Sequence, residues 1–519
     1  MLVLRGSLTV TRPTSALALL AALALALSAC TAGSGTDPER TAQSRGGSGA
    51  STDSIVLGLV AEPASLDFTQ DDGAAIPQLL LNNVYEGLVK LDQDGDIVPA
   101  LATTWSVSDD RLTYTFELTD QATFSNGESF TAADAVFSIE RLSSDWATSV
   151  GTGVGAVIDS ATAVSPTKVE VKLAAPSNSW LYKMTTRAGA MFSEKGVAHL
   201  ANDPVGTGPY DVESWKRGDS ITLTRRDDYW GDLPHFQKVV FRYFGDATAL
   251  NNALLTGDID VATTVQAPEA LGQFTGKDNL QVIEGTTDGE VLLSFNNNQE
   301  IFKDKRIRLA IRQAIDHQAL VDTCWAGKGT LVGSFVPPTD PWYEDLTGVT
   351  PYDPQEATRL VNEAGKAGAT LRLRLPTLPY AESCGPVVKS YLEAVGFDVA
   401  MDSLEFPAAW LQQVYKGSDY DLSIVNHVES RDLAHVFGNP EYYTHYGTPE
   451  IQELFKLADE GSQDDQVENL KKAARLIAED AAADVLFVAS NLMVADKDIT
   501  GLPKNAIGES FDVTLLGKG

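Results

Sequence analysis

Strand and helix patterns alternate between Thr370 and Val425, and this alternation restricts the fold more than any other stretch of the sequence. A β-α-β-α-β run gives parallel strands joined by helical crossovers. The sequence therefore predicts an α/β fold. The expected strands are 370–375 (TLRLRL), 397–402 and 420–425 (YDLSIV), and the expected helices are 382–395 and 408–416.

The carboxyl edge of this predicted sheet is the expected place for a ligand. In open α/β sheets, ligands bind in the crevice beyond the carboxyl ends of the strands. The stretch after Val425 and the loop 376–384 should both face that crevice, because each follows one of the strands. The polar and aromatic side chains in these two segments include Tyr380, His427, Glu429, Asp432, Phe437, Tyr442, Tyr443 and Tyr446.

Three histidines, His427, His435 and His445, lie close to two acids and raise the question of a metal site. Imidazole and carboxylate suit zinc, nickel or iron. Spacings of eight and ten residues do not place the three imidazoles on one helix face, and neither CxxC nor HExxH occurs. We expect no metal bound directly by the chain and no cofactor. The open alternative is a metal or metal complex as the bound solute.

Nucleotide and nucleophile motifs are also missing. The glycines of 151–155 do not follow the GxGxxG spacing, so this segment is expected to be a flexible loop. Neither a P-loop nor GxSxG occurs, and nothing places a nucleophile beside a base. The formal charge of −32, with 71 acidic against 39 basic residues, argues against a nucleic-acid partner. We expect a protein that is not an enzyme, with an extracellular hydrolase as the remote alternative.

The first thirty residues indicate export and lipid anchoring. Two arginines precede an apolar run over 16–27, which is shorter than the ~20 residues of a membrane-spanning helix. The Leu-Ser-Ala-Cys sequence that ends at Cys30 resembles the lipobox of bacterial lipoproteins. We therefore expect a signal peptide over 1–29, lipid attachment at Cys30 and a flexible tether over 30–53. The protein would be extracytoplasmic and held at the cell membrane by its lipid alone.

Cys324 and Cys384 are the only other cysteines. Both would lie in an oxidising compartment, where disulfides persist. They could pair, but the sequence does not give their distance, so the paired and the free states both stay open.

Further strand and helix patterns occur along the rest of the chain. A length of 519 residues, at roughly 100 to 200 per domain, predicts two to four folding units. Thr131 is a predicted helix N-cap with Asp134 in the first turn. The other expected elements are strands over 54–60, 113–118 and 168–173, a helix over 76–88 and a tight turn over 91–97, whereas 265–285 has no regular pattern.

Several motifs follow one another in a characteristic order. They are VYEGL (84–88), PALA (99–102), FSNG (124–127), TAAD (131–134), PVGTGPY (204–210), YWG (229–231), LTGDIDV (255–261), FKDKR (302–306), AID (314–316) and YDP (352–354). This combination resembles the family 5 extracytoplasmic solute-binding proteins, which are the dipeptide, oligopeptide and nickel binders of ABC importers. The likeness runs from about residue 55 to the C-terminus.

The resemblance implies an α/β, two-lobed fold like that of periplasmic binding proteins (type II, cluster C), with mixed sheets, an extra sub-domain and the ligand cleft between the lobes. It also implies capture of di- or oligopeptides by lobe closure and delivery to permease subunits that work with a separate ATPase. Nickel, a metal chelate or another non-peptide solute stays the alternative ligand. The implied division is lobe I over 54–93, 205–295 and 495–519, the extra sub-domain over 94–204, and lobe II over 296–494.

The resemblance also suggests how a peptide would be held. In peptide-binding relatives, a Trp followed shortly by an Asp lies near this part of the chain, and the Asp holds the peptide ammonium. Here the region is HVESRD, residues 427–432, and the Trp is missing. Glu429 or Asp432 could take the role of the acid, although Arg431 could instead neutralise one of them.

Two residues of the VYEGL motif, Tyr85 and Glu86, are carried over from the same resemblance as crevice residues of lobe I. The alternative is a tyrosine packed in the core beside an exposed acid. The candidate ligand-binding residues are Tyr85, Glu86, Tyr380, His427, Glu429, Asp432, Tyr442 and Tyr443.

Overall fold

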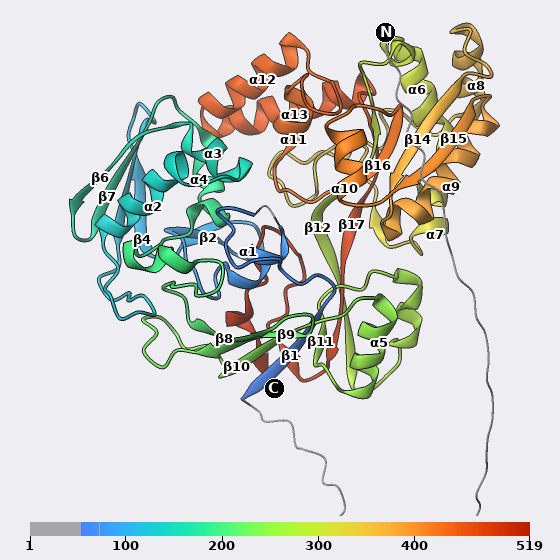
Figure 1. The fold of residues 1–519 in the computed structure, drawn as a ribbon. Helices are drawn as coiled ribbons and strands as arrows, with labels where there is room; N and C mark the ends of the chain where they lie inside the picture. Colours follow the sequence, from blue (N-terminus) through green and yellow to red (C-terminus); the bar gives the residue numbers. More distant parts are fainter. Residues whose placement is uncertain (1–52, 72) are drawn as a thin grey trace, which may run out of the picture. The chain divides into compact units, whose positions relative to one another are not determined.

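The structure is a computed structural model that describes residues 53–71 and 73–519 (Figure 1). The predicted signal peptide, Cys30 and the predicted tether up to residue 52 lie outside the described residues. Within the described ranges, every helix is too short or too polar to cross a membrane.

Eleven strands form one mixed sheet, with β12 and β17 near its middle. In order of pairing they are β15 (Asp398–Leu404), β14 (Thr370–Pro376), β16 (Leu422–His427), β12 (Leu280–Phe295), β17 (Asp484–Asp496), β11 (Val261–Ala262), β1 (Ser54–Leu59), β10 (Lys238–Tyr243), β9 (Ser220–Arg225) and β8 (Tyr210–Lys216), while β13 (Gly329–Thr330) pairs with β17.

Buried apolar side chains form two sets of cores at the two ends of this sheet. One set draws on residues 55–280 and 492–516 and defines lobe I. The other draws on residues 291–488 and defines lobe II. Each lobe therefore has a core of its own. Each fully buried Leu or Phe in these cores adds about 1.5–3 kcal/mol of hydrophobic stabilisation. The predicted α/β, two-lobed fold is therefore present.

The strands β12 and β17 belong to both lobes, and we call them the crossing strands. They pair antiparallel over most of their length and run side by side from one lobe to the other (Figure 1). Their register is irregular between Thr286 and Glu290, where the ladder is interrupted. Beyond this point β12 pairs with β16 on its other side.

A four-stranded antiparallel sheet and three short helices add to lobe I. The alternating segment TYTFEL turns Tyr114 and Phe116 inward, into the same core that surrounds β1. The predicted N-cap is present, because the Thr131 backbone N–H donates to Asp134 Oδ2 at 2.9 Å. The strands are β4 (Ala102–Val107), β5 (Thr113–Leu118), β7 (Lys168–Leu173) and β6 (Ile158–Ser165), and the helices are α2 (Ala132–Ser144), α3 (Ser149–Gly155) and α4 (Asn178–Lys183).

The helix predicted over 76–88 is wrong in its second half, because α1 spans only Ala75–Leu80. Asn82 has a φ of 65°, in the left-handed region that does not continue a helix. The Asn83 side-chain amide donates hydrogen bonds to the carbonyl oxygens of Leu79 and Phe511, each at 2.9 Å. A contact with the far end of the chain therefore decides where this helix ends.

The prediction of a flexible loop over 151–155 is also wrong, because these residues form most of α3. A side chain at Gly151 would place its Cβ 2.3 Å from the Trp146 ring. At Gly155, the Cβ would lie 2.8 Å from the carbonyl carbon of Leu142. The glycines allow α3 to pack directly against α2 and the residues that follow it.

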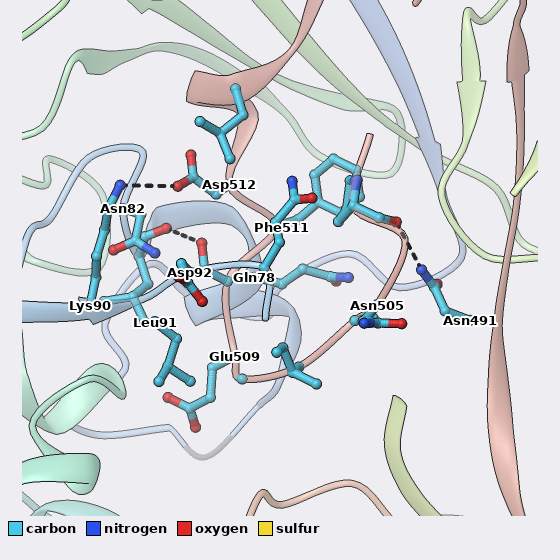
Figure 2. Close-up of a pocket in the computed structure, with 18 of the residues that line it drawn as sticks. Gln78, Asn82, Lys90, Leu91, Asp92, Asn491, Asn505, Glu509, Phe511 and Asp512 are labelled. Carbon is cyan, nitrogen blue, oxygen red and sulfur yellow. Dashed lines mark hydrogen bonds and ion pairs between the residues drawn. The ribbon is translucent and has the colours of Figure 1, made fainter. Parts of the chain in front are cut away.

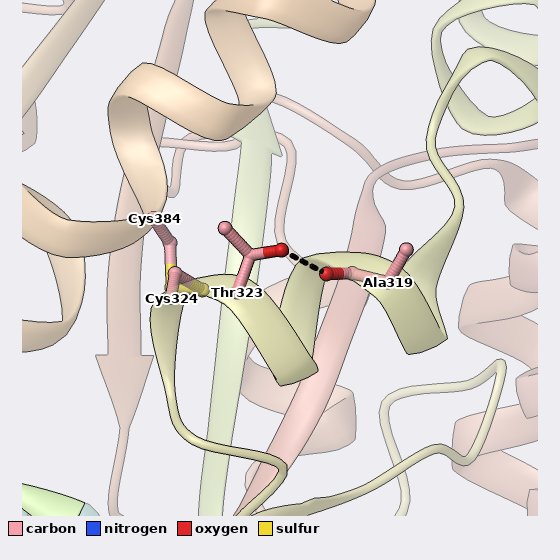
Figure 3. Close-up of a disulfide and its surroundings, with 4 residues drawn as sticks. All are labelled: Ala319, Thr323, Cys324 and Cys384. Carbon is pink, nitrogen blue, oxygen red and sulfur yellow. Dashed lines mark hydrogen bonds between the residues drawn. A yellow bond between two sulfur atoms is a disulfide. The ribbon is translucent and has the colours of Figure 1, made fainter. Parts of the chain in front are cut away.

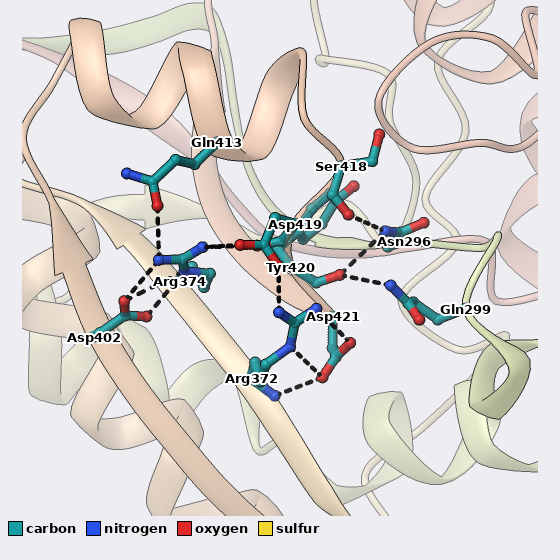
Figure 4. Close-up of polar contacts among 10 residues, drawn as sticks. All are labelled: Asn296, Gln299, Arg372, Arg374, Asp402, Gln413, Ser418, Asp419, Tyr420 and Asp421. Carbon is teal, nitrogen blue, oxygen red and sulfur yellow. Dashed lines mark hydrogen bonds and ion pairs between the residues drawn. The ribbon is translucent and has the colours of Figure 1, made fainter. Parts of the chain in front are cut away.

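The predicted β-α-β-α-β run is confirmed. β14 is parallel to both β15 and β16. Its arginines reach acids on the neighbouring segments: Arg374 pairs with Asp402 at 3.0 Å and with Asp419 at 2.9 Å, and Arg372 pairs with Asp421 at 3.3 Å (Figure 4). The crossover helices are α9 (Pro379–Ala394) and α10 (Ala408–Trp410), which continues as a π-helical turn over Leu411–Tyr415.

A disulfide joins Cys324 at the end of α7 (His317–Cys324) to Cys384 in α9 (Figure 3). Because α9 begins at Pro379, the predicted loop 376–384 is shorter than expected, and Tyr380 lies in the first turn of this helix.

The remaining elements complete the two lobes. The unassigned segment 265–285 contains a short 3₁₀ helix, Pro268–Gln273, and the start of β12. The predicted turn over 91–97 connects β2 and β3, and Gly95 within it has a φ of 88°. The other elements are β2 (Val89–Leu91), β3 (Ile97–Pro99), α5 (Ala247–Thr256), α6 (Lys305–Ala314), α8 (Pro354–Glu363), α11 (Leu433–Gly438), α12 (Pro449–Glu460), α13 (Gln463–Glu479), β18 (Ile499–Thr500) and β19 (Gly517–Lys518).

Candidate ligand-binding site

The stretch after β16 begins with a group of hydrogen-bonded polar side chains. His427 ends β16, and its Nε2 lies 2.8 Å from Tyr443 Oη. Its Nδ1 lies 3.5 Å from Asp432 Oδ2. Tyr443 Oη is in turn 2.6 Å from Ser294 Oγ on β12. The structure thus brings His427, Asp432 and Tyr443 together and connects them to a crossing strand.

A group of buried acids lies beside His427. Glu290 is opposite His427 in the β12–β16 ladder, at the end of the register irregularity. Asp288 Oδ2, within the irregularity, accepts hydrogen bonds from Ser430 Oγ and, at 3.1 Å, from the Gly508 N–H. Each of these acids is less than one tenth exposed. The group, which we call the acid cluster, consists of Asp288, Glu290, Asp340 and Asp432.

Burial raises the pKa values of three carboxyl groups in the acid cluster. It raises the pKa of Asp340 to about 7, against the opposing attraction of Arg431. Burial also raises the pKa of Glu290 well above its usual range, and the nearby carboxylates of Asp432, Asp288 and Asp340 raise it further. The pKa of Asp288 rises by burial too, partly offset by its hydrogen bonds. Burial and the repulsion between these carboxyl groups therefore both oppose their ionisation.

Arg431 connects the acid cluster to lobe I. Its Nε lies 3.3 Å from Asp340 Oδ1, so it neutralises Asp340 rather than Glu429 or Asp432. The guanidinium carbon lies 3.7 Å from the centre of the Tyr182 ring, which α4 of lobe I supplies. The Arg431 φ of 58° is in the left-handed region, which residues with a Cβ seldom adopt.

Glu429 is exposed and lies at the edge of the acid cluster. Partial burial and the Asp432 carboxylate raise its pKa, whereas His427 and Arg187 lower it. Arg187 belongs to lobe I, and its Nη2 is fixed 2.6 Å from Glu509 Oε1. Glu429 makes no hydrogen bond or ion pair with any described residue. It therefore offers a carboxylate close to both lobes.

The lobes also meet where α4 lies against the end of α12, and we call this the α4–α12 contact. The Asn178 side-chain amide donates to the carbonyl oxygens of Ala458 at 2.7 Å and Gly461 at 2.9 Å. Asp459 Oδ1 accepts from the Ser179 backbone N–H at 2.9 Å. Lobe I thus satisfies carbonyl groups that the end of a helix leaves without partners.

Aromatic rings lie beside the acid cluster in lobe II. The Tyr442 ring centre is 4.5 Å from that of His435 and 5.0 Å from that of Tyr443. Phe437 and Tyr446, which were expected to face the same crevice, are buried in the core of lobe II.

The three histidines do not converge on one point. His445 lies apart, with its Nε2 2.8 Å from Ser418 Oγ, whereas His427 and His435 contact different tyrosines. Over residues 53–71 and 73–519, no three His, Cys, Asp or Glu side chains have an arrangement that could hold a metal ion.

Of the two candidate tyrosines outside the stretch after β16, Tyr380 lies close to that strand and Tyr85 does not. Tyr380 Oη accepts a hydrogen bond from the Asn426 N–H at 3.0 Å, so Tyr380 lies beside the carboxyl end of β16. Tyr85 packs in the core of lobe I, with its ring centre 5.4 Å from that of Phe68. The structure does not bring Tyr85 to the acid cluster.

Glu86 is buried, so the alternative of an exposed acid is wrong. It accepts hydrogen bonds from Tyr229 Oη at 2.8 Å and from Trp230 Nε1 at 2.9 Å. Burial raises the pKa of Glu86, and these two donors lower it. Glu86 borders a cavity of about 320 Å³ in lobe I, away from the acid cluster.

A second cavity, of about 270 Å³, lies between α1, the β2–β3 hairpin and the C-terminal segment 503–515 (Figure 2). Lys90 and Asp512 pair at its border at 3.5 Å. Gly508 and Glu509 line this cavity and also contact Asp288 and Arg187, so the C-terminal segment separates it from the acid cluster.

Sequence reasoning missed Asp288, Glu290 and Asp340. A signal existed for the first two, since Asp-Gly-Glu directly precedes the buried run 291–295, and acids are rare at the entry of a central strand. Asp340 lies between β13 and α8 without any periodic pattern, and only the tertiary fold brings it to the cluster.

Two lobes joined by paired crossing strands give the chain the α/β fold of type II periplasmic binding proteins. The sequence profile "Bacterial extracellular solute-binding proteins, family 5 Middle" matches residues 96–448. The chain belongs to this family.

Three similar proteins bind different ligands. The glutathione-binding protein GsiB of Salmonella paratyphi A is 29% identical over 323 residues, and the match spans 60% of this chain and 61% of GsiB. The oligopeptide-binding protein AppA of Bacillus subtilis, in complex with a nonapeptide, has a TM-score of 0.76 at 22% identity, covering 90% of this chain and 99% of AppA. NikZ of Campylobacter jejuni, in complex with Ni(L-His), has a TM-score of 0.77 at 18% identity, covering 90% of this chain and all of NikZ. GsiB and AppA are named as binding proteins, not as enzymes.

Proposed function

We propose that this chain is the extracytoplasmic receptor of an ABC importer, which captures a small solute by lobe closure and delivers it to permease subunits driven by a separate ATPase. The observation that carries this proposal is the convergence of side chains from both lobes at the carboxyl end of β16, with Arg431 against Tyr182 and Glu429 near Arg187. Closure at this point would bury a solute between the lobes. We propose that residues 54–295 and 495–519, including the extra sub-domain 94–204, move against 296–494.

We propose a di- or oligopeptide as the solute. The exposed carboxylate of Glu429 and the carboxylate of Asp432 suit a peptide ammonium. The names of GsiB and the AppA complex support this class of ligand. The second candidate is a nickel complex, which the imidazoles of His427 and His435 near the site and the NikZ complex favour.

The ligand class can be tested by calorimetric titration of the purified protein with Ala-Ala, glutathione, a nonapeptide and nickel–histidine. Peptide binding without nickel binding is the expected result. If only nickel–histidine binds, the peptide assignment is wrong. Mass spectrometry of small molecules that co-purify with the protein gives an independent identification.

The ammonium assignment predicts the effect of two substitutions. Asp432→Asn and Glu429→Gln should each weaken binding of the best peptide by about 2 kcal/mol or more, the scale of a truncated charge pair. Glu441→Gln, at an exposed acid of lobe II, is the matched control and should leave affinity unchanged. Wild-type affinity in both test variants would refute the assignment.

We also propose that Cys30 carries a lipid anchor. The lipobox-like sequence supports this, and two or more acyl chains suffice for stable anchoring. Cys30→Ser should move the protein from the membrane fraction to the soluble fraction. An unchanged distribution would disprove the anchor.

A further inference from the structure

The acid cluster has more carboxyl groups than its neighbours balance. Among the described residues, ion pairs reach it only from Arg431, which contacts Asp340, and from His427, which contacts Asp432. Asp288 accepts hydrogen bonds from neutral donors instead. Glu290 differs from these three, because its Oε2 has no hydrogen-bond partner within the described part of the chain.

The position of Glu290 makes this lack of a partner informative. Its side chain is only 2% exposed, and the residues that follow it in β12, Val291 to Leu293, are apolar and fully buried. An unpartnered polar group is costly at such a position, where an apolar side chain would stabilise the strand. A positive group that arrives from outside the chain would give this carboxylate a partner.

Arg431 indicates which kind of group fits beside the acid cluster. Its guanidinium lies 3.3 Å from Asp340, 3.7 Å from the Tyr182 ring centre and 5.1 Å from the Trp342 ring centre. Stacking on aromatic rings and pairing with carboxylates are the two ways in which proteins hold planar cations. These surroundings therefore accept a guanidinium, and carboxylates suit a primary amine equally well.

We propose that the acid cluster, apart from Asp432 and with Glu290 as its central acceptor, is a subsite for a positively charged group of the solute other than its terminal ammonium, either a guanidinium or a primary amine. The inference rests on the proposed receptor function and assigns that receptor to basic solutes. Glu429, at the exposed edge, remains available for the terminal ammonium.

The test compares Ala-Arg with Ala-citrulline, two dipeptides that have nearly the same shape and differ by one charge. The wild-type protein should bind Ala-Arg at least about tenfold more tightly, and Glu290→Gln should remove this preference. Glu284→Gln is the matched control, because Glu284 lies on the same strand and pairs with Lys328 at 2.6 Å at the surface. This control should keep the preference.

The outcomes separate the subsite from the receptor function. Equal affinities for the two dipeptides, or a preference that persists in Glu290→Gln, would overturn the subsite and leave the peptide receptor intact. If neither dipeptide binds, the peptide assignment fails, and agmatine tests the subsite alone. Agmatine should then raise the melting temperature of the wild-type protein but not of Glu290→Gln, and no rise in the wild type would overturn the subsite. Should Glu290→Gln fail to fold by circular dichroism, Asp340→Asn serves in the same comparison.

Discussion

The four carboxyl groups of the acid cluster avoid an uncompensated buried charge in different ways. Asp340 pairs with Arg431 and Asp432 with His427. Asp288 accepts two hydrogen bonds, and burial raises the pKa of Glu290 well above its usual range. A raised pKa of this kind makes the free energy of unfolding depend on pH.

Stability without ligand should fall as the pH rises from about 4 to about 7. Burial raises the pKa of Asp340 to about 7, whereas the unfolded carboxyl titrates near 3.9. The folded state therefore holds more protons in this window, and unfolding becomes easier with rising pH by up to ~1.4 kcal/mol per pH unit for each such group. Urea unfolding of the wild type and Asp340→Asn across this range measures the effect. The variant should show a smaller slope, and equal slopes would contradict the assignment.

At the scale of elements, the sequence pattern predicted helices and strands correctly where the segments that pack together are also close in sequence. The β-α-β-α-β run is such a case, because each crossover helix packs on the strands beside it. Prediction failed for α1, where Asn83 bonds to Phe511, 428 residues away, and for α3, where glycines serve close packing rather than mobility.

The candidate site was likewise predictable only in the part that follows one strand in the sequence. The crevice rule led to His427, Asp432 and Tyr443, which follow one strand. It could not lead to Asp340, because no sequence pattern shows which distant loop approaches that strand.

The disulfide between α7 and α9 should stabilise lobe II without affecting the ligand. It closes a loop with a sequence separation of 60 residues. Replacing both Cys324 and Cys384 by Ser should lower the free energy of unfolding by about 2–4 kcal/mol, because the unfolded chain gains freedom. Denaturant unfolding and calorimetric titration of the double variant measure stability and affinity. A large loss of affinity would mean that the disulfide also shapes the binding site.

At the scale of the whole molecule, contacts at two further places join the lobes in addition to the crossing strands. Arg431 contacts Tyr182 beside the acid cluster, and Asn178 binds the end of α12 at the α4–α12 contact. The second place is made of hydrogen bonds between the lobes that no solute needs to touch. If the lobes close on a solute as proposed, this contact sets how long the closed state lasts.

Loss of the α4–α12 contact should shorten that time. Asn178→Ala removes the hydrogen bonds of this amide to carbonyl oxygens of lobe II. The two shorter ones are worth roughly 1–2 kcal/mol together, so the solute should dissociate about tenfold faster. Stopped-flow displacement of a bound peptide measures this rate. Asn469→Ala is the matched control, since the Asn469 amide bonds only within its own helix, to the Asp465 carbonyl oxygen at 2.8 Å. If the two variants release peptide at the same rate, the contact does not hold the closed state.

The crossing strands have a consequence for melting. Because β12 and β17 pair in both lobes, on either side of the irregularity between Thr286 and Glu290, we expect the two lobes to unfold together. Differential scanning calorimetry should then give a single heat-absorption peak whose van't Hoff and calorimetric enthalpies agree, although the chain has two separate sets of cores. The chain would then melt as one unit although it is built as two lobes.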